Sequence, residues 1–384
     1  MVTVTRKTKK LEKDTYSLVC DMNNIMKIAS VNHDMNSEGK EYGMVATTLR
    51  MIGDVLKKKD FDYCVAAYDG YGSGFLRYKM YKDYKANRGK SYALFDPEVT
   101  DYEKKMILAQ MKILEYSKKK KKENNPKYIE DEDESFERQR EIIWAILENL
   151  CIRQYRYNYV EGDDVISNYI KNKPSNEKCV IISSDKDLTQ LISDTVIIWN
   201  PRTKSFITKD NSKEVLGIPH TNIVLEKILC GDSSDNIKGV KGVGEQTLKK
   251  YIPQIMTDRL DLEAVVSISQ GLLDSRKAEK KKPLQALQNI VSGVTDGCQG
   301  DKLYEINKKL IDLSEPLMTE EAFKEFNDEV YAPLDLSDRN MKNIYEIVRK
   351  NNMSVLCEEG KFGNLFSPFS RIIMMEKKRS ENNG

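Results

Sequence analysis

The 384-residue chain has few residues that bind transition metals or form disulfides. It contains two histidines, His33 and His220, and seven cysteines that stand singly along the sequence. No two cysteines have CxxC spacing, which argues against a structural zinc site and a disulfide framework. Any bound metal would therefore need oxygen ligands. Most of the cysteines lie in apolar segments, which is typical of buried thiols in a reducing cytosol, so we expect a cytoplasmic protein.

Long apolar runs and a large net charge are also absent. No stretch approaches the 18 or so apolar residues that span a bilayer, and the basic N-terminus lacks the apolar segment of a secretory signal. We therefore expect no membrane contact. The 62 basic residues are nearly balanced by 60 acidic ones, so binding partners must be inferred from local charge.

Four short apolar segments predict strands, at residues 16–20, 63–68, 179–183 and 196–199. Segments rich in β-branched and aromatic residues are typical of strands buried on both faces. Helical patterns lie between them, for example at 141–150 and 163–172. This alternation predicts an α/β fold whose central, mostly parallel sheet is flanked by helices.

Acidic residues follow three of these strands. Asp21 and Asp69 come at the ends of two strands, and Asp185 and Asp187 follow a third. Binding sites in open parallel sheets lie beyond the carboxyl ends of the strands, so we expect an acidic rim there. A turn-forming or helix-capping role is the alternative for any single residue.

Five further carboxylates complete a candidate metal site. Glu161 and Asp164 are three residues apart at the start of a predicted helix, with Asp163 beside them, and Asp232 and Asp235 repeat that spacing. Gathered together, nine carboxylates would repel one another unless cations bound. Oxygen ligands indicate Mg²⁺ or Mn²⁺, and two such ions suit phosphodiester hydrolysis.

A cationic segment rich in tyrosine follows Asp69. If residues 75–88 are helical, one stripe carries Arg77, Tyr81, Tyr84 and Arg88, with Lys85 at its edge. Cations interleaved with tyrosines suit a substrate that has phosphates and bases. The alternative is an amphipathic helix whose tyrosines lie in the core.

Residues 239–244, GVKGVG, suggest the turn of a helix–hairpin–helix. Gly239, Gly242 and Gly244 would let the backbone approach a phosphate closely, and Lys241 lies among them. Further cations, Lys249 and Lys250, follow on the next predicted helix. A purely structural turn between two helices is the alternative.

Together these motifs resemble the structure-specific 5′-nucleases, the family of flap endonucleases and 5′-3′ exonucleases. In family order they read LVCDMNN, YDGYGSGFLRYKMYKDYKANR, VEGDDVISNYI, VIISSDKDLTQLI and GDSSDNIKGVKGVGEQT. The chain is most similar to the phage ribonuclease H branch of that family. Gly162 departs from the pattern, because the family usually has alanine there.

The resemblance implies two metal positions and a set of substrate contacts. The first position would be surrounded by Asp21, Asp69, Glu161, Asp163 and Asp185, and the second by Asp164, Asp187, Asp232 and Asp235. Lys85 and Arg88 would contact the scissile phosphate, with Arg77 and Tyr84 nearby. The glycine hairpin would hold downstream duplex, in the family often with a K⁺ ion.

The resemblance also implies a domain organisation: a basic extension at 1–14, a catalytic domain at 15–220 with a helical arch at about 75–135, and a helix–hairpin–helix and C-terminal helical region at 221–384. Within the arch, charge blocks at Lys118–Lys122 and Glu130–Glu134 are typical of a solvated loop.

The implied activity is Mg²⁺-dependent 5′-3′ exonuclease and flap endonuclease cleavage of branched DNA and RNA–DNA hybrids, which would remove primers or flaps during replication. We expect a monomer, with a sliding clamp or single-strand binding protein as candidate partners. Two rival functions remain: a catalytically silent junction-binding protein and a PIN-type ribonuclease. Carboxylates that face phosphates disfavour the first, and the glycine hairpin disfavours the second.

Overall fold

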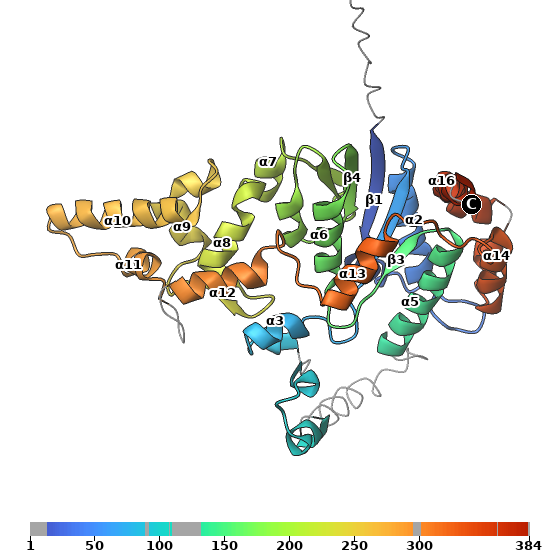
Figure 1. The fold of residues 1–384 in the computed structure, drawn as a ribbon, viewed down its shortest axis with the longest axis horizontal. Helices are drawn as coiled ribbons and strands as arrows, with labels where there is room; N and C mark the ends of the chain where they lie inside the picture. The colour runs from blue at the N-terminus through green and yellow to red at the C-terminus, as the bar shows by residue number, and fades with distance from the viewer. Residues whose placement is uncertain are drawn as a thin grey trace, which may run out of the picture.

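The computed structural model describes residues 14–88, 92–106, 108–109, 132–294, 301–358 and 360–382. At its centre is a six-stranded sheet in the order β3-β2-β1-β4-β5-β6, with helices on both faces (Figure 1). Neighbouring strands are parallel except for the last pair, β5 and β6. The predicted α/β class is therefore confirmed. The strands are β1 Thr15–Asp21, β2 Tyr63–Ala67, β3 Arg153–Tyr155, β4 Glu177–Ile182, β5 Val196–Asn200 and β6 Ser205–Ile207.

The four predicted strands are β1, β2, β4 and β5, with small shifts at their ends. The two strands that were not predicted, β3 and β6, have three residues each. Segments that short carry too few side chains to display a period of two, and β3 also begins with the charged Arg153. Both lie toward the edges of the sheet, where they extend it without altering its centre.

Alternate residues of β1 enter different hydrophobic cores. Leu18 and Cys20 pack on one face of the sheet, and Val19 packs on the other. The first face is covered by α1 Met22–Ala29, α2 Gly43–Leu56, α5 Glu132–Asn149, α14 Met341–Lys350, α15 Lys361–Phe366 and α16 Ser370–Asn382. The second face is covered by α6 Gly162–Asn172 and α13 Glu320–Glu329.

A third core joins the segment after β2 to a helical region beside the sheet. Its helices are α3 Phe75–Met80, α8 Ile223–Cys230, α9 Glu245–Tyr251, α10 Leu262–Ala278, α11 Gln285–Ser292 and α12 Asp301–Ile311. The short helix α7, Ser212–Leu216, precedes this region. Residues from Leu313 onward pack against the sheet instead. The predicted boundary at residue 220 stays a prediction, but hydrophobic packing divides the helical region near residue 312.

The C-terminal helix α16 is tied to the sheet by a buried ion pair. Glu376 on α16 accepts hydrogen bonds from the guanidinium of Arg153 on β3, at 2.7 and 3.1 Å. Both side chains are almost fully buried. Arg379 adds bonds to Glu376 and to the backbone oxygen of Asp62. Helix α16 is therefore part of the fold that surrounds the sheet.

Residues 75–88 do not form the single helix that the stripe of Arg77, Tyr81, Tyr84 and Arg88 would require. Helix α3 ends at Met80, and Tyr81 has extended backbone angles. Lys85 lies in the left-handed region, with φ of 52°, and residues 86–88 form a short 3₁₀ turn. Tertiary contacts described below hold this break in place.

Several predictions fall on residues outside the described ranges. They include most of the N-terminal extension, the Lys118–Lys122 block and the centre of the predicted arch. Across the described part of the chain, none of the helices combines the length and apolar character that membrane crossing requires.

Candidate active site

Three aspartates meet at the carboxyl edge of the sheet because β1 lies between β2 and β4. Asp21 is the last residue of β1, Asp69 follows β2, and Asp185 follows β4. The chain leaves β1 toward β2 on one side and returns as β4 on the other, which is the strand arrangement that places ligands at such an edge. The predicted acidic rim is therefore formed.

Short hydrogen bonds orient these carboxylates. Asp21 accepts from the Ser183 hydroxyl at 2.7 Å and caps α1 by accepting from the Asn24 amide at 3.2 Å. Asp69 accepts from the side-chain amide of Asn23 at 2.6 Å and from the backbone amide of Gly162 at 2.8 Å. The capping alternative is thus correct for one oxygen of Asp21, and its second oxygen accepts from Ser183.

Helix α6 adds carboxylates beside Asp69 through its first residues. Glu161 precedes the helix and Asp163 lies in its first turn. A Cβ atom added at Gly162 would meet its nearest neighbours, including Asp69 Oδ1, at 3.5 Å, which is ordinary van der Waals contact. The departure from the alanine usual in the family therefore leaves the carboxylates undisturbed.

Burial and neighbouring like charges raise the pKa values of two acids in this group. Burial raises the pKa of Asp21 to about 7; the Ser183 hydrogen bond only partly opposes the rise, and the charges of Asp185 and Asp69 add to it. Burial, followed by repulsion from Asp21 and Asp185, raises the pKa of Asp163 well above its ordinary value. A bound cation would relieve this repulsion.

A second group of carboxylates surrounds a lysine that the motifs did not include. Lys227, on α8, bonds Asp232 at 2.5 Å and also contacts Asp187. Burial disfavours the charged form of Asp232, but Lys227 and Ser234 outweigh burial and lower its pKa to about 2. Burial raises the pKa of Asp187 to about 6, although Lys227 opposes the rise.

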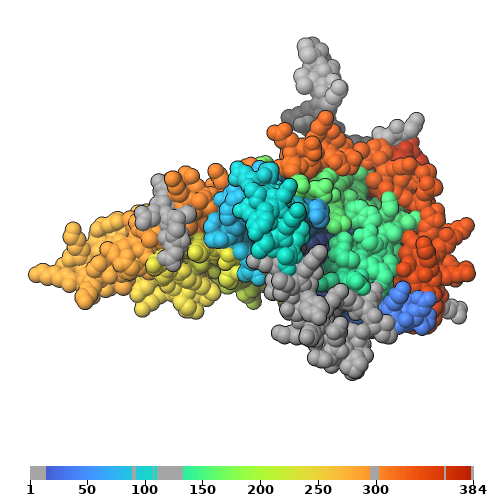
Figure 2. Space-filling model, turned by 90° about the horizontal axis from the view of Figure 1, so that it is seen from below, coloured from blue at the N-terminus to red at the C-terminus, as the bar shows by residue number. Residues whose placement is uncertain are grey.

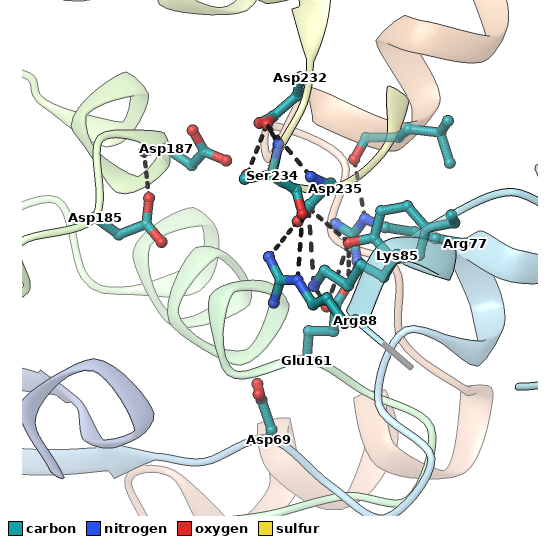
Figure 3. Close-up of polar contacts among 12 residues, drawn as sticks. Asp69, Arg77, Lys85, Arg88, Glu161, Asp185, Asp187, Asp232, Ser234 and Asp235 are labelled. Carbon is teal, nitrogen blue, oxygen red and sulfur yellow. Dashed lines mark hydrogen bonds and ion pairs between the residues drawn. The ribbon is translucent and has the colours of Figure 1, made fainter. Parts of the chain in front are cut away.

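Lys85 and Arg88 enter the same site from the loop after α3 (Figure 3). Lys85 contacts Glu161 and lies 3.8 Å from Asp235, and Arg88 bonds Asp235 at 2.5 Å. Burial opposes the charge on Lys85, but Glu161 and Asp235 raise its pKa above the ordinary value. Burial also opposes the charge on Glu161, whose pKa Lys85 and Arg77 nevertheless lower to about 2.

Backbone contacts hold the loop 83–88 against the loop 233–236. Lys85 donates its amide to the oxygen of Asp235 at 2.8 Å. The Asn87 side chain donates to the oxygen of Ser233 at 2.9 Å, and the Asn236 side chain donates to the oxygen of Asp83 at 2.7 Å. These contacts, between residues about 150 positions apart, fix Lys85 in its left-handed conformation. We call this arrangement the loop clasp.

The predicted substrate contacts of Arg77 and Tyr84 need correction. The Arg77 guanidinium is buried and binds Glu161 at 2.7 Å and Asp164 at 2.5 and 3.0 Å. The Tyr84 hydroxyl is buried between Glu161 and Asp235, at 3.0 Å from each. Tyr81 packs beside the same core. Because α3 ends before these tyrosines, they form no exposed stripe, and the core alternative describes them better.

Asp164 shares the Arg77 guanidinium with Glu161. Besides Arg77, it accepts from the backbone amide of Leu317 at 2.9 Å, and its side chain is 1% exposed. Its contacts fit a role in holding Arg77 better than a role as a metal ligand.

A small cavity of about 30 Å³ lies among the remaining groups, with Lys85, Glu161, Asp163, Asp187 and Asp235 in its lining. That volume suits a water molecule or a small ion. Within the described ranges, no three acidic, histidine or cysteine side chains lie close enough together to form a finished metal site. Lys85, Arg88 and Lys227 occupy carboxylate oxygens that a cation would use, so the donor chemistry fits Mg²⁺ once those ion pairs open.

The glycine turn, residues 239–244, follows α8 and the small β7–β8 hairpin, Gly231–Asp232 and Ile237–Lys238. Gly239 is required by packing, since a Cβ there would lie 2.2 Å from the carbonyl carbon of Cys230. Gly242 has φ of 76°, and a Cβ at Gly242 or Gly244 would meet only open space. The first glycine is thus structural, while the other two leave exposed backbone that a ligand can approach.

Comparisons with known proteins agree with this geometry. Residues 27–217, about half of the chain, match the model of the 5′-3′ exonuclease N-terminal resolvase-like domain. The chain belongs to the 5′-3′ exonuclease family. The predicted class, a metal-dependent hydrolase that cleaves nucleic acid, is the class of this family.

Relatives within the 5′-3′ exonuclease family match different shares of the chain. DNA polymerase I of Bacillus subtilis is 32% identical over 160 residues, which are 40% of this chain and 18% of the polymerase. The 5′-3′ exonuclease of Mycoplasma pneumoniae is 26% identical over 247 residues, 61% of this chain and 70% of its own. The chain thus spans less than a fifth of the polymerase.

A solved structure of T5 5′-exonuclease with divalent zinc ions has the same fold. It superposes with a TM-score of 0.51 at 18% identity and covers 88% of this chain and 98% of its own. Lys227 is the main residue of the candidate site that sequence reasoning missed. Its spacing of five residues before Asp232 was the available signal, but a lysine on an apolar helix is usually a surface residue.

Proposed function

We propose that the chain is a Mg²⁺- or Mn²⁺-dependent 5′-3′ exonuclease and flap endonuclease that hydrolyses phosphodiester bonds of branched DNA. The observation that carries the proposal is the meeting of Asp21, Asp69, Asp163 and Asp185 at one sheet edge beside Lys85 and Arg88. A protein that only binds phosphates would gain nothing from acids at that place.

Two groups of carboxylates would hold two ions. Asp21, Asp69, Glu161, Asp163 and Asp185 form the first group, and Asp187, Asp232 and Asp235 form the second. Bound ions would lower the pKa of water at the site and neutralise charge on the leaving oxygen. Hydrolysis adds water across the P–O bond, so no side chain needs to act as a nucleophile.

Lys85 and Arg88 are proposed to bind the scissile phosphate. The raised pKa of Lys85 keeps it protonated over the working pH range. It can therefore stabilise charge but cannot act as a general base. An incoming phosphate would replace Glu161 and Asp235 as the partner of these cations, which would free both carboxylates for metal ions.

The finer substrate assignment rests on the resemblance to the phage ribonuclease H branch. We assign 5′ flaps and the RNA of RNA–DNA hybrids as substrates, and primer or flap removal on the lagging strand as the role. Gly242, Gly244, Lys241, Lys249 and Lys250 would contact the downstream duplex, with K⁺ as a candidate ion at the turn. A sliding clamp or single-strand binding protein as partner stays a prediction.

The test compares cleavage of a 5′-flap DNA and a 5′-RNA/DNA hybrid with and without Mg²⁺. The variant Asp69→Asn/Asp185→Asn should lose roughly 100-fold or more in single-turnover rate, since even outer contacts of metal sites cost 10–100-fold. Asp210→Asn, an exposed turn residue, is the matched control. Normal cleavage by the double variant would refute the proposal, and tight flap binding without turnover in either metal would favour the silent junction-binding protein.

A further inference from the structure

A helical hairpin extends from the region of the glycine turn and forms one end of the molecule (Figure 1). Its arms are α10 and α11, which pack together through Val265, Leu287 and Ile290, all of them fully buried. The hairpin begins shortly after α9, the helix that carries Lys249 and Lys250. The hairpin is therefore a folded extension of the proposed duplex-binding region.

The tip of this hairpin, residues 276–282, concentrates positive charge. It contains five cationic residues and one acid, whereas the whole chain has a net charge of only +2. Lys277, Lys280, Lys281 and Lys282 are all exposed. Lys281 lies 2.7 Å from Glu279, but both side chains are more than half exposed, so water screens that pair strongly.

The tip has a defined backbone. Arg276 donates its Nε to the oxygen of Lys282 at 2.9 Å, and the Lys281 amide donates to the oxygen of Arg276 at 2.8 Å. Lys280 has φ of 56°, a left-handed conformation that glycine would adopt without cost. A lysine at that position adds charge where turn chemistry favours glycine. The lysines therefore lie on a turn whose backbone is held by hydrogen bonds.

The α10–α11 hairpin, which carries the tip, projects from the part of the molecule that holds α9 and α12 (Figure 1). Figure 2 views the molecule from the side of residues 75–106, and the segment near residue 240 and the α10–α11 hairpin follow one another across that face. Helix α10 has 17 residues, so it reaches about 25 Å at 1.5 Å per residue. That length matches roughly seven base pairs of B-form duplex at 3.4 Å per pair.

We infer that residues 276–282 form a second phosphate-binding surface for the downstream duplex, about seven base pairs beyond the glycine turn. The inference rests on the proposed function, because it assumes that the duplex runs from the active site across the glycine turn. It adds a duplex-length requirement that the carboxylates and the turn alone would not impose. Lysines at a helix C-terminus also complement the helix dipole, but that role involves no duplex-length requirement.

The test uses the variant Lys280→Gln/Lys281→Gln/Lys282→Gln and flap substrates whose downstream duplex ranges from about 5 to about 30 base pairs. Binding is measured by fluorescence anisotropy in Ca²⁺, so that no cleavage is needed. The matched control is Lys57→Gln/Lys58→Gln/Lys59→Gln. These three consecutive exposed lysines follow α2, near the amino end of β2 and away from the acidic rim.

The tip variant should bind the longest duplex about fivefold or more weakly than wild type, and the shortest within about twofold. On the longest duplex, its slope of log Kd against log salt should fall by about 2, the value expected when two to three phosphate contacts are lost. The control should match wild type at every length. Thermal unfolding of both variants checks that they are folded.

A loss of affinity that is the same at all duplex lengths, or no loss at all, would overturn the inference. Single-turnover cleavage of the short-duplex flap in Mg²⁺ should be unchanged in the tip variant, because the substrate does not reach the tip. If wild type fails to cleave any flap, the proposed function fails, while the length dependence of binding still decides the inference.

Discussion

The ammonium group of Lys227 lies 2.5 Å from a carboxylate oxygen of Asp232. The same ammonium contacts Asp187, so one protein cation joins two of the acids that we assign to the second metal position. These three side chains come from α8, the segment after β4 and the β7–β8 hairpin. In the absence of metal, Lys227 balances the charge that Mg²⁺ would balance.

Lys227→Met should therefore destabilise the metal-free protein and strengthen its response to metal. Removing one partner of a buried pair leaves the other charge uncompensated, so the free energy of unfolding in EDTA should fall by about 3 kcal/mol. Saturating Mg²⁺ should restore more stability to the variant than to wild type, since no lysine competes for the carboxylates. Lys178→Met, which removes an exposed ion pair with Asp14, is the control. An equal Mg²⁺ response in all three proteins would contradict this account.

Metal-free stability should fall as pH rises from about 5 to about 7. Burial raises the pKa of Asp21 to about 7 and that of Asp187 to about 6, from the ordinary aspartate value of 3.8. The folded state thus holds more protons than the unfolded state over this range, and each such group costs up to about 1.4 kcal/mol per pH unit. Urea unfolding in EDTA at several pH values measures the slope.

Asp21→Asn should flatten that slope, whereas Asp210→Asn should not. Excess Mg²⁺ should also reduce it, because bound metal favours the deprotonated carboxylates. Below about pH 4 the trend reverses: the pKa of Glu161 is lowered to about 2, so its contribution is lost as pH falls toward that value. Stability that rises steadily from pH 5 to pH 7 in EDTA would be incompatible with these pKa values.

Arg77→Met should cost about 3–5 kcal/mol of unfolding free energy, because it leaves Asp164 buried without its cation and leaves Glu161 with Lys85 alone. Arg77→Met combined with Asp164→Leu should recover part of that loss, since Asp164→Leu removes the buried carboxylate that has lost its cation. Chemical denaturation of the two variants and of Asp164→Leu alone completes a double-mutant cycle. If the losses of unfolding free energy were additive, Arg77 and Asp164 would not interact. That result would contradict the contacts described above.

Glu376→Gln should destabilise the whole fold around the sheet by about 3 kcal/mol, through the loss of its charge opposite Arg153. Unfolding should remain a single transition, because α16 shares a core with the sheet. Glu381→Gln, at an exposed position on the same helix, is the control and should change stability by less than about 0.5 kcal/mol. A separate early transition in Glu376→Gln would show that α16 unfolds on its own.

The sequence was informative where structure depends on local pattern. The strands that hold Asp21 and Asp69 are continuous apolar runs, and the order of strands in parallel folds brings their ends together. The break after Met80 could not be predicted, because hydrogen bonds from residues about 150 positions away determine it. The pair of Arg153 with Glu376 is separated by 223 positions, so no periodicity could reveal it.

The loop clasp holds Lys85 and Arg88 in a fixed position relative to the proposed duplex-binding region. Lys85 and Arg88 are bonded to the segment that leads into the glycine turn, so a shift of that turn carries both cations with it. The bound duplex, and not the free 5′ end, would then determine which phosphodiester bond is cleaved. A flap of any length would be cleaved at the same distance from its junction, and a single strand without duplex would lose turnover rate as well as affinity.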